Sequence, residues 1–206
     1  MAFRAVLFDV GGVVVGSPLE AIARYERDNG IPAGFVNRVV VGAGTGGAWS
    51  RLERGELRLD EFYVAFDADC ANAGGRLSAR ELMALVAAST VPRPAMLEAI
   101  RRIRARGLRA AAVTNNWITD DEGTGILKPH FDAFIESAVT GVRKPDPRIF
   151  EIACETLGIT AAEAVMLDDI GANLKTARAL GMTTIRVADP DAALAELETV
   201  LGFPLR

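Results

Sequence analysis

Residues 5–12 read AVLFDVGG, in which four apolar residues run without interruption into Asp9 and are followed shortly by a pair of glycines. Two later stretches follow the same plan. Residues 108–116 read LRAAAVTNN and residues 164–169 read AVMLDD, so each apolar run again ends on polar residues. Unbroken apolar runs of this length are typical of strands that are buried on both faces of a parallel sheet. Residues 183–187 form a fourth, weaker run.

Amphipathic helical patterns separate these runs. Residues 94–106 place their apolar side chains on one stripe and are followed by Gly107, a residue that commonly terminates helices. Residues 147–157 and 190–200 each begin with proline, which is favoured in the first helical turn, and a further pattern covers residues 173–180. The alternation of strand and helix predicts an α/β fold with a Rossmann-like parallel sheet built from right-handed βαβ units.

Residues 17–90 contain no such apolar run and show helical patterns instead. We expect five helices, at residues 18–29, 33–41, 48–54, 60–73 and 78–88. Because no buried strand interrupts them, we predict an all-helical cap domain at residues 17–90, inserted after the first strand. The α/β core domain would then consist of residues 1–16 and 91–206.

The composition is that of a globular protein of 206 residues, half of them hydrophobic, with a net charge of −4. This balance is too apolar for a disordered chain and too acidic for a surface that coats nucleic acid. Cys70 and Cys154 lack the spacing of a zinc site or a disulfide framework, and His130 is the only histidine. The N-terminus lacks a basic-then-apolar leader. We therefore expect a cytoplasmic protein with no nucleic-acid or membrane partner, whose oligomeric state the sequence leaves open.

Polar side chains follow three of the predicted strands at the points where ligands bind in open parallel sheets, outside the carboxyl ends of the strands. Lys144 lies in the loop sequence RKPDP, residues 143–147, immediately before a helix. We expect the following side chains to converge at one edge of the sheet: Asp9, Thr114, Asn115, Lys144, Asp168 and Asp169.

Several carboxylates without a nearby histidine favour a hard divalent ion such as Mg²⁺. A carboxylate nucleophile, an ammonium and hydroxyl or amide donors are the groups that phosphoryl transfer requires. Taken alone, Asp9 is also consistent with a turn residue and Lys144 with a solvated loop lysine. The pair Asp168-Asp169 is harder to explain in this way, because adjacent like charges after a buried run are costly without a cation.

The order of four motifs resembles that of the haloacid dehalogenase superfamily of hydrolases. The motifs are FDVGGV at residues 8–13, VTN at 113–115, KP at 144–145 and LDD at 167–169. More narrowly, three stretches are similar to the phosphatase-type N-terminal domain of soluble epoxide hydrolases and its bacterial stand-alone relatives: TNNWITDD at 114–121, HFDAFIES at 130–137 and LDDIGANLK at 167–175. The resemblance covers essentially the whole chain and implies that the helical insert is the family's cap domain.

The resemblance also implies which residues hold the metal. Asp9 would be both the nucleophile and a Mg²⁺ ligand, and the main-chain carbonyl of Gly11 would be a second ligand. Asp169 would reach the metal directly, Asp168 would support it without direct contact, and Asn173 would hydrogen-bond within the same loop.

The remaining implied roles concern the phosphoryl group. Thr114 and Asn115 would bind it, and Lys144 would steady both the phosphate and Asp9. The implied function is a Mg²⁺-dependent phosphatase that acts on a small phosphorylated substrate through an aspartyl-phosphate intermediate.

Gly11 departs from the family's phosphatases, which usually carry a second aspartate two residues after the nucleophile as general acid and base. Glycine cannot donate a proton, and general acid catalysis is typically worth about 10²–10⁴-fold. Two alternatives therefore stay open: a non-catalytic protein that binds phosphate ligands, and a carbon-directed hydrolase of the dehalogenase type. Asp168-Asp169 argues against the second alternative, because a carbon-directed site needs no metal that neutralises a dianion. No motif in the sequence identifies the substrate.

Overall fold

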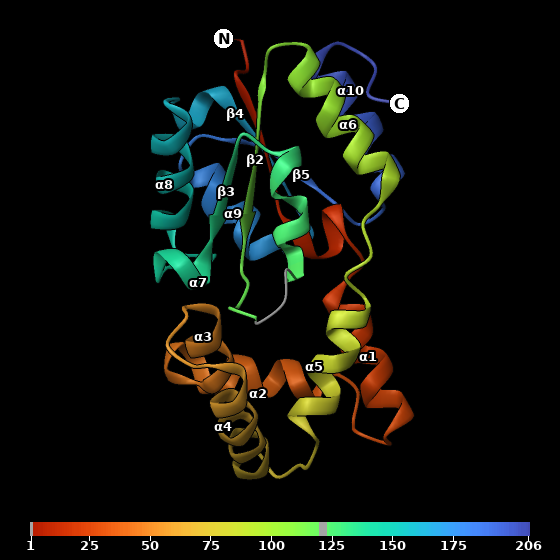
Figure 1. Ribbon diagram of the computed structural model, residues 1–206, viewed down its shortest axis with the longest axis vertical. Coiled ribbons are helices and arrows are strands. Elements are labelled where there is room, and N and C mark those ends of the chain that lie inside the picture. Colours follow the sequence, from red (N-terminus) through yellow and green to blue (C-terminus); the bar gives the residue numbers. More distant parts are fainter. Residues whose placement is uncertain (1, 120–122) are drawn as a thin grey trace.

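Five parallel strands form the centre of the molecule (Figure 1). The computed structural model describes residues 2–119 and 123–206, so Asp120 and Asp121 of the stretch TNNWITDD lie outside the described residues. The strands are β1 (Ala5–Phe8), β2 (Arg109–Thr114), β3 (Ala133–Glu136), β4 (Ala164–Asp168) and β5 (Thr183–Arg186). Their order in the sheet is β3-β2-β1-β4-β5, which confirms the predicted α/β fold with a parallel sheet.

The central strand β1 pairs with β2 on one side and β4 on the other. Because every pairing is parallel, the carboxyl ends of all five strands meet at one edge of the sheet. We did not expect β3 from the sequence. It lies at the edge of the sheet, where Ile135 is its only buried residue, and its apolar run covers just three residues, 133–135.

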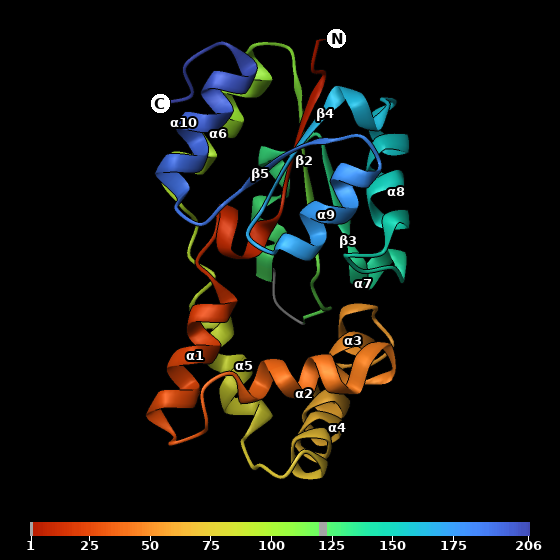
Figure 2. The same cartoon turned by 180° about the vertical axis from the view of Figure 1, so that it is seen from behind.

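Helices cover both faces of this sheet (Figures 1 and 2). α6 (Pro94–Ala105) and α10 (Pro190–Leu201) pack on one face, and α8 (Pro147–Leu157) and α9 (Gly171–Ala179) pack on the other. Shorter helical turns are Val10–Val14, Gly44–Gly46, Gly123–His130, α7 (Ser137–Thr140) and Ala161–Glu163. Within the described residues, no helix is both long and apolar enough to cross a membrane.

β1 contributes to the core on both faces of the sheet. Val6 and Phe8 belong to the core beneath α6 and α10, whereas Ala5 and Leu7 belong to the core beneath α8 and α9, and all four are fully buried. Burying a large apolar side chain contributes about 1.5–3 kcal/mol. The residue that follows this strand, Asp9, therefore extends from a firmly held part of the molecule.

Residues 17–90, which the structure describes completely, contain five helices and no strand. They are α1 (Pro18–Asp28), α2 (Phe35–Ala43), α3 (Ala48–Glu53), α4 (Leu59–Asn72) and α5 (Ala79–Ala88). This helical segment has a core of its own, in which the rings of Trp49, Phe62 and Phe66 pack with centroids 5.2–5.7 Å apart. It lies beyond the carboxyl edge of the sheet (Figure 1). Division of the chain into two domains stays a prediction.

Two connections between the helical segment and the sheet run side by side. Val15 forms an antiparallel bridge with Pro92, and the amide of Gly16 donates to the carbonyl of Val91 at 3.1 Å. A Cβ atom on Gly16 would lie 2.2 Å from the carbonyl oxygen of Ser89, so only glycine permits this close approach. The two chain connections between the helical segment and the sheet thus lie directly against each other.

Candidate active site

Asp9 stands at the carboxyl edge of the sheet, directly after β1. Its Oδ1 accepts a hydrogen bond of 2.7 Å from the amide of Val10, which fixes the carboxylate at the start of the following turn. Within that turn Gly12 has φ 79°, a conformation that favours glycine. A Cβ atom on Gly12 would also lie 2.4 Å from Asp169 Oδ2. The turn therefore brings Asp169 close to the Asp9 loop only because position 12 has no side chain.

Lys144 is the cation of the site and is 1% exposed. Its Nζ atom lies 2.7 Å from Asp9 Oδ1 and 2.8 Å from Asp168 Oδ2. Burial acts to lower the pKa of Lys144, but the two neighbouring aspartates outweigh it and raise this pKa above its ordinary value. Lys144 is therefore held in its charged form between the two carboxylates.

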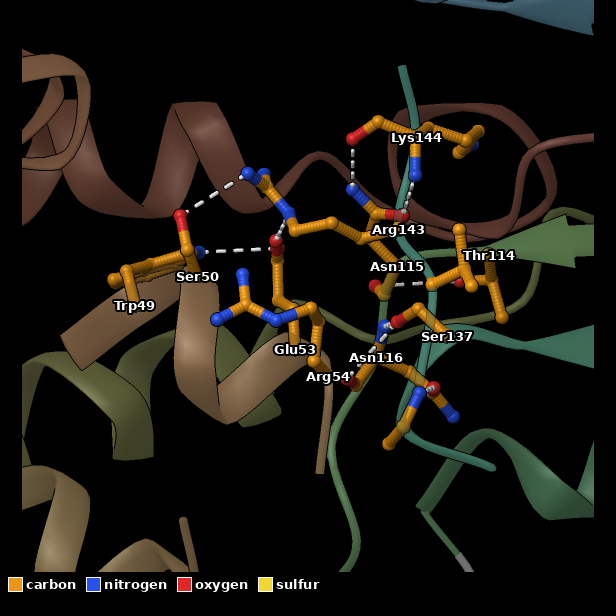
Figure 3. Close-up of polar contacts among 12 residues, drawn as sticks. Trp49, Ser50, Glu53, Arg54, Thr114, Asn115, Asn116, Ser137, Arg143 and Lys144 are labelled. Atoms are coloured by element: carbon orange, nitrogen blue, oxygen red, sulfur yellow. Dashed lines mark hydrogen bonds and ion pairs between the residues drawn. The ribbon is translucent and has the colours of Figure 1, made fainter. Parts of the chain in front are cut away.

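Asn115 anchors the main chain of Lys144 (Figure 3). Its Oδ1 accepts a hydrogen bond from the Lys144 amide at 2.8 Å, and its Nδ2 donates to the Lys144 carbonyl at 3.0 Å. Thr114 precedes it at the end of β2 and is 3% exposed. The Asn115 side chain thus links β2 to the lysine loop.

The two adjacent aspartates have different surroundings. Asp168 is fully buried, and both of its oxygens accept hydrogen bonds from Asn173 Nδ2, at 3.0 and 3.1 Å. The amide of Ile170 and the ammonium of Lys144 complete its partners at 2.8 Å each. Asp169 Oδ1, in contrast, is buried and has no hydrogen-bond partner among the described residues. Both oxygens of Asp168 are thus occupied by hydrogen bonds, whereas Asp169 Oδ1 is available to a ligand.

Three aspartates and one lysine meet at this edge of the sheet, so negative charge exceeds positive charge there. Asp9, Asp168 and Asp169 each offer a carboxylate oxygen, and these atoms lie within 4.8 Å of one another. Burial, followed by the repulsion of neighbouring aspartates and opposed by Lys144, raises the pKa of Asp9 to about 7. Burial and the Asp168 charge likewise raise the pKa of Asp169 to about 6. A cluster of buried carboxylates with one free oxygen and no histidine fits a hard divalent cation.

A cavity of about 1280 Å³ adjoins the carboxyl edge of the sheet, next to the turn that follows Asp9. From the sheet it is lined by Gly11, Thr114 and Asn115. From the other side it is lined mainly by apolar residues of the helical segment and of the loop after β2, which include Leu59, Tyr63, Met83, Val86, Trp117 and Ile118. A smaller hollow of about 510 Å³, around Arg4 and Leu180, contains none of the site residues.

The motifs and the fold agree with one known family. A model of haloacid dehalogenase-like hydrolases matches residues 3–181. This chain belongs to that family. A crystal structure of a haloacid dehalogenase family enzyme from Bacteroides thetaiotaomicron, in complex with magnesium and inorganic phosphate, has the same fold, with a TM-score of 0.62, 20% identity and coverage of 90% of this chain and 94% of that one.

Two curated relatives of this haloacid dehalogenase-like hydrolase are more similar in sequence. Bifunctional epoxide hydrolase 2 of Sus scrofa is 35% identical over all of this chain but only 40% of its own length, which confirms the resemblance to soluble epoxide hydrolases. Sesquiterpene phosphatase astK of Aspergillus oryzae is 25% identical over 97% of both chains. The chain spans only about a fifth to two fifths of the mammalian relatives that it matches first.

Gly11 is the position at which the resemblance implies a departure from the usual phosphatases of the family. Its φ of −68° and ψ of 127° are open to any residue, whereas the neighbouring Gly12 has the positive φ that favours glycine. A Cβ atom on Gly11 would meet the ring of Pro18 at 3.0–3.1 Å. The first residue of α1 therefore occupies the space that a side chain at position 11 needs.

We expect the wild-type enzyme to prefer aryl and acyl phosphates, whose leaving groups need no proton, over alkyl phosphates. Gly11→Asp should improve the turnover of alkyl phosphates by up to about 10²-fold, because it adds a general acid beside Asp9. Gly11→Asp combined with Pro18→Ala should improve it further, since the smaller residue leaves room for the new side chain. The measurement is kcat/KM across a series of leaving groups, with thermal melts as the folding control. If wild-type kcat/KM does not depend on leaving-group pKa while chemistry is rate-limiting, another residue supplies the proton.

Two features of the site were not predicted from the sequence. The glycine pair after β1 was noted, but the requirement for glycine at position 12 follows from the approach of Asp169, which comes from a distant strand. The contact of Arg143 with Glu53 was also missed, because no local pattern relates residues from two separate parts of the chain.

Proposed function

We propose that this chain is a Mg²⁺-dependent phosphatase that hydrolyses small phosphate monoesters with Asp9 as its nucleophile. The observation that carries the proposal is the buried Lys144 between Asp9 and Asp168, next to an Asp169 oxygen that has no hydrogen-bond partner in the part of the chain that the structure describes. A site built only to stabilise the fold would not leave a buried carboxylate oxygen unpaired, because that arrangement is costly.

The carboxylates of Asp9 and Asp169, with the main-chain carbonyl of Gly11, would hold the Mg²⁺ ion. Asp168 would stay behind them, because Lys144, Asn173 and Ile170 already occupy its oxygens. Bound Mg²⁺ would neutralise part of the phosphoryl charge, so that an anionic nucleophile can approach phosphorus.

The chain's own residues would perform two displacements. Asp9 attacks phosphorus, its carboxylate oxygen forms a P–O bond, and the bond to the alcohol oxygen of the substrate breaks. Water then attacks the aspartyl phosphate, which releases inorganic phosphate and restores Asp9. Lys144 holds the Asp9 carboxylate in place, while the Thr114 hydroxyl and the Asn115 amide bind phosphoryl oxygens. The leaving oxygen takes its proton from water or substrate, because Gly11 has none to donate.

The apolar lining of the cavity favours substrates that carry an apolar group on the phosphate. The name of the fungal relative, a sesquiterpene phosphatase, is consistent with this preference. Ala84 of α5 lines the cavity and is exposed, so a charge there should oppose an apolar substrate without burying itself in the core. We expect Ala84→Asp to lower kcat/KM for long-chain alkyl or aryl phosphates by about tenfold and for acetyl phosphate much less.

The matched control for Ala84→Asp is Val64→Asp on α4. Val64 is 74% exposed and does not line the cavity. Steady-state kinetics on both variants with both substrates makes the comparison. Equal losses for long-chain phosphates and for acetyl phosphate in Ala84→Asp would contradict an apolar substrate site.

The direct experiment is a phosphatase screen across sugar, lipid, nucleotide and acyl phosphates, with Mg²⁺ and with a chelator. We expect turnover that disappears with the chelator and returns with Mg²⁺. Binding of phosphate or vanadate without any turnover would favour the non-catalytic alternative. Release of halide from 2-haloacids without Mg²⁺ would favour the carbon-directed alternative.

Mg²⁺ should stabilise the fold in a pH-dependent way. The pKa values of Asp9 and Asp169 rise from 3.8 to about 7 and about 6, so the folded chain binds protons more tightly than the unfolded chain. The stability of the metal-free chain therefore falls as the pH rises from about 4 to about 7. Mg²⁺ replaces those protons, so it should raise the melting temperature more at about pH 8 than at about pH 5.5.

Differential scanning calorimetry with and without Mg²⁺ at the two pH values measures this effect. The control is Asp169→Ala, in which the Mg²⁺-dependent shift should be lost at both pH values because the oxygen without a partner is gone. A Mg²⁺ shift of the same size in Asp169→Ala would rule out this carboxylate as a ligand.

A further inference from the structure

A partly buried ion pair joins the helical segment to the core beside the site (Figure 3). Glu53, the last residue of α3, places its Oε2 atom 2.5 Å from Nε of Arg143, the residue before Lys144. Arg143 Nη1 also donates to Ser50 Oγ on α3 at 3.2 Å. Trp49 Nε1 donates to the other Glu53 oxygen at 3.1 Å. Two residues of α3, Glu53 and Ser50, thus contact Arg143 of the core, and a third, Trp49, holds the Glu53 carboxylate.

This contact depends on charge. The side chains of Glu53 and Arg143 are 9% and 26% exposed, and their facing atoms lie close without the alignment of a hydrogen bond. Burial raises the pKa of Glu53, although Arg143 acts to lower it. Removing two charges from water offsets most of their attraction, so an apolar pair of similar volume often stabilises a fold as well or better. The pair is therefore poorly explained by stability alone.

Its location suggests a different role. In Figure 1, α3 faces α7 on one side of the molecule, whereas the two connections run beside α1 and α5 on the other side. A second close contact lies next to α3. Gly55, with φ 71°, packs against the main chain of α7, and a Cβ atom on it would lie 2.3 Å from the carbonyl oxygen of Ala138. The helical segment is tethered covalently at one side of the sheet edge and by Glu53 and Gly55 at the other.

The ion pair is also connected to the site through the main chain. Arg143 is bonded to Lys144, whose main chain is paired with Asn115 and whose ammonium contacts Asp9. A displacement of Arg143 along α3 would therefore move the lysine and the phosphoryl-binding end of β2. Misplacing a catalytic group by 1 Å can cost on the order of 10²-fold in rate.

We propose that Glu53 is a positioning residue: by holding Arg143, it docks the helical segment across the cavity and sets the position of the loop that carries Lys144. Its effect on turnover rests on the phosphatase function proposed above, whereas the docking itself does not. The site would then be fully assembled only while the helical segment is docked.

The test compares Glu53→Gln, the charge-swapped pair Glu53→Arg/Arg143→Glu, and the control Glu56→Gln. Glu56 pairs with Arg54 at 2.6 Å in the same turn of the helical segment, but that ion pair is exposed. We expect Glu53→Gln to lower kcat/KM by about tenfold and to speed hydrogen exchange of the amides around the end of α3. The charge-swapped pair should recover part of both losses, because it restores the ion pair but not the hydrogen bond from Trp49 to Glu53, and Glu56→Gln should resemble the wild type.

Hydrogen exchange separates this proposal from the phosphatase function. If the wild type hydrolyses no phosphate ester, the proposed function fails, and faster exchange in Glu53→Gln alone still supports docking. If the wild type is active and Glu53→Gln matches Glu56→Gln in both kcat/KM and hydrogen exchange, the proposal is overturned. Faster exchange with unchanged kcat/KM would overturn the positioning role. If Glu53→Gln does not fold, the charge-swapped pair decides: folded and active supports the proposal, folded and inactive overturns it.

Discussion

Asp9→Asn is expected to reduce kcat by at least about 10³-fold while the chain stays folded. The amide has nearly the same shape as the carboxylate, and its oxygen can still accept hydrogen bonds from Val10 and Lys144, which now contact Asp9 Oδ1. It is not a nucleophile, however, and it is a weaker ligand for a divalent cation. The loss should therefore appear in the chemical step rather than in the fold.

Steady-state kinetics on the best substrate of the phosphatase screen, together with a thermal melt, measures both quantities. The control is Asp28→Asn, an exposed aspartate of α1 that pairs with Arg24 at 3.4 Å. That variant should keep wild-type activity. Wild-type activity in Asp9→Asn, with a normal melting temperature, would exclude Asp9 as the nucleophile.

Lys144→Met is expected to have the largest effect on stability. Methionine fills a similar volume, but it leaves Asp9 and Asp168 buried without their shared cation. Breaking a buried ion pair by removing one partner typically costs about 3–5 kcal/mol. We expect a loss of this size in the free energy of unfolding, together with the loss of turnover.

Denaturant unfolding of Lys144→Met and of the double variant Lys144→Met/Asp168→Asn tests this account. The double variant removes one of the uncompensated charges, so it should recover part of the lost stability but none of the activity. A free energy of unfolding for Lys144→Met within about 0.5 kcal/mol of the wild type, the range of ordinary surface substitutions, would mean that the lysine is not a structural cation of the site.

The sequence was informative where a local pattern has a single structural meaning. The apolar runs at 5–8, 108–113 and 164–167 predicted the three central strands, because strands buried on both faces require such runs. The weaker run at 183–187 predicted the edge strand β5, because it follows a helical pattern that Gly181 terminates. β3, the other edge strand, was not predicted, since it has one buried residue and only a three-residue apolar run. The grouping of Asp9 with Asp168-Asp169 was expected from the shared carboxyl edge of a parallel sheet.

Local sequence patterns did not predict the features that depend on how distant segments of the chain approach one another. Gly11 and Gly12 are adjacent in the sequence, and only the structure shows that Pro18 crowds the first position and Asp169 the second. The sequence placed Asn115 at the edge of the sheet, but no local pattern shows that its side chain pairs with the main chain of Lys144. The contact of Glu53 with the residue before that lysine likewise depends on how the helical segment docks.

The most direct measurement of the central claim is mass spectrometry of the enzyme quenched in acid during turnover of an acyl or aryl phosphate with Mg²⁺. We predict that the peptide containing Asp9 carries the added mass of one phosphoryl group, that the label disappears when substrate is exhausted, and that Asp9→Asn never acquires it. A phosphoryl group on another residue, or rapid turnover without any labelled peptide when hydrolysis of the intermediate is shown to be rate-limiting, would contradict the assignment of Asp9 as the nucleophile.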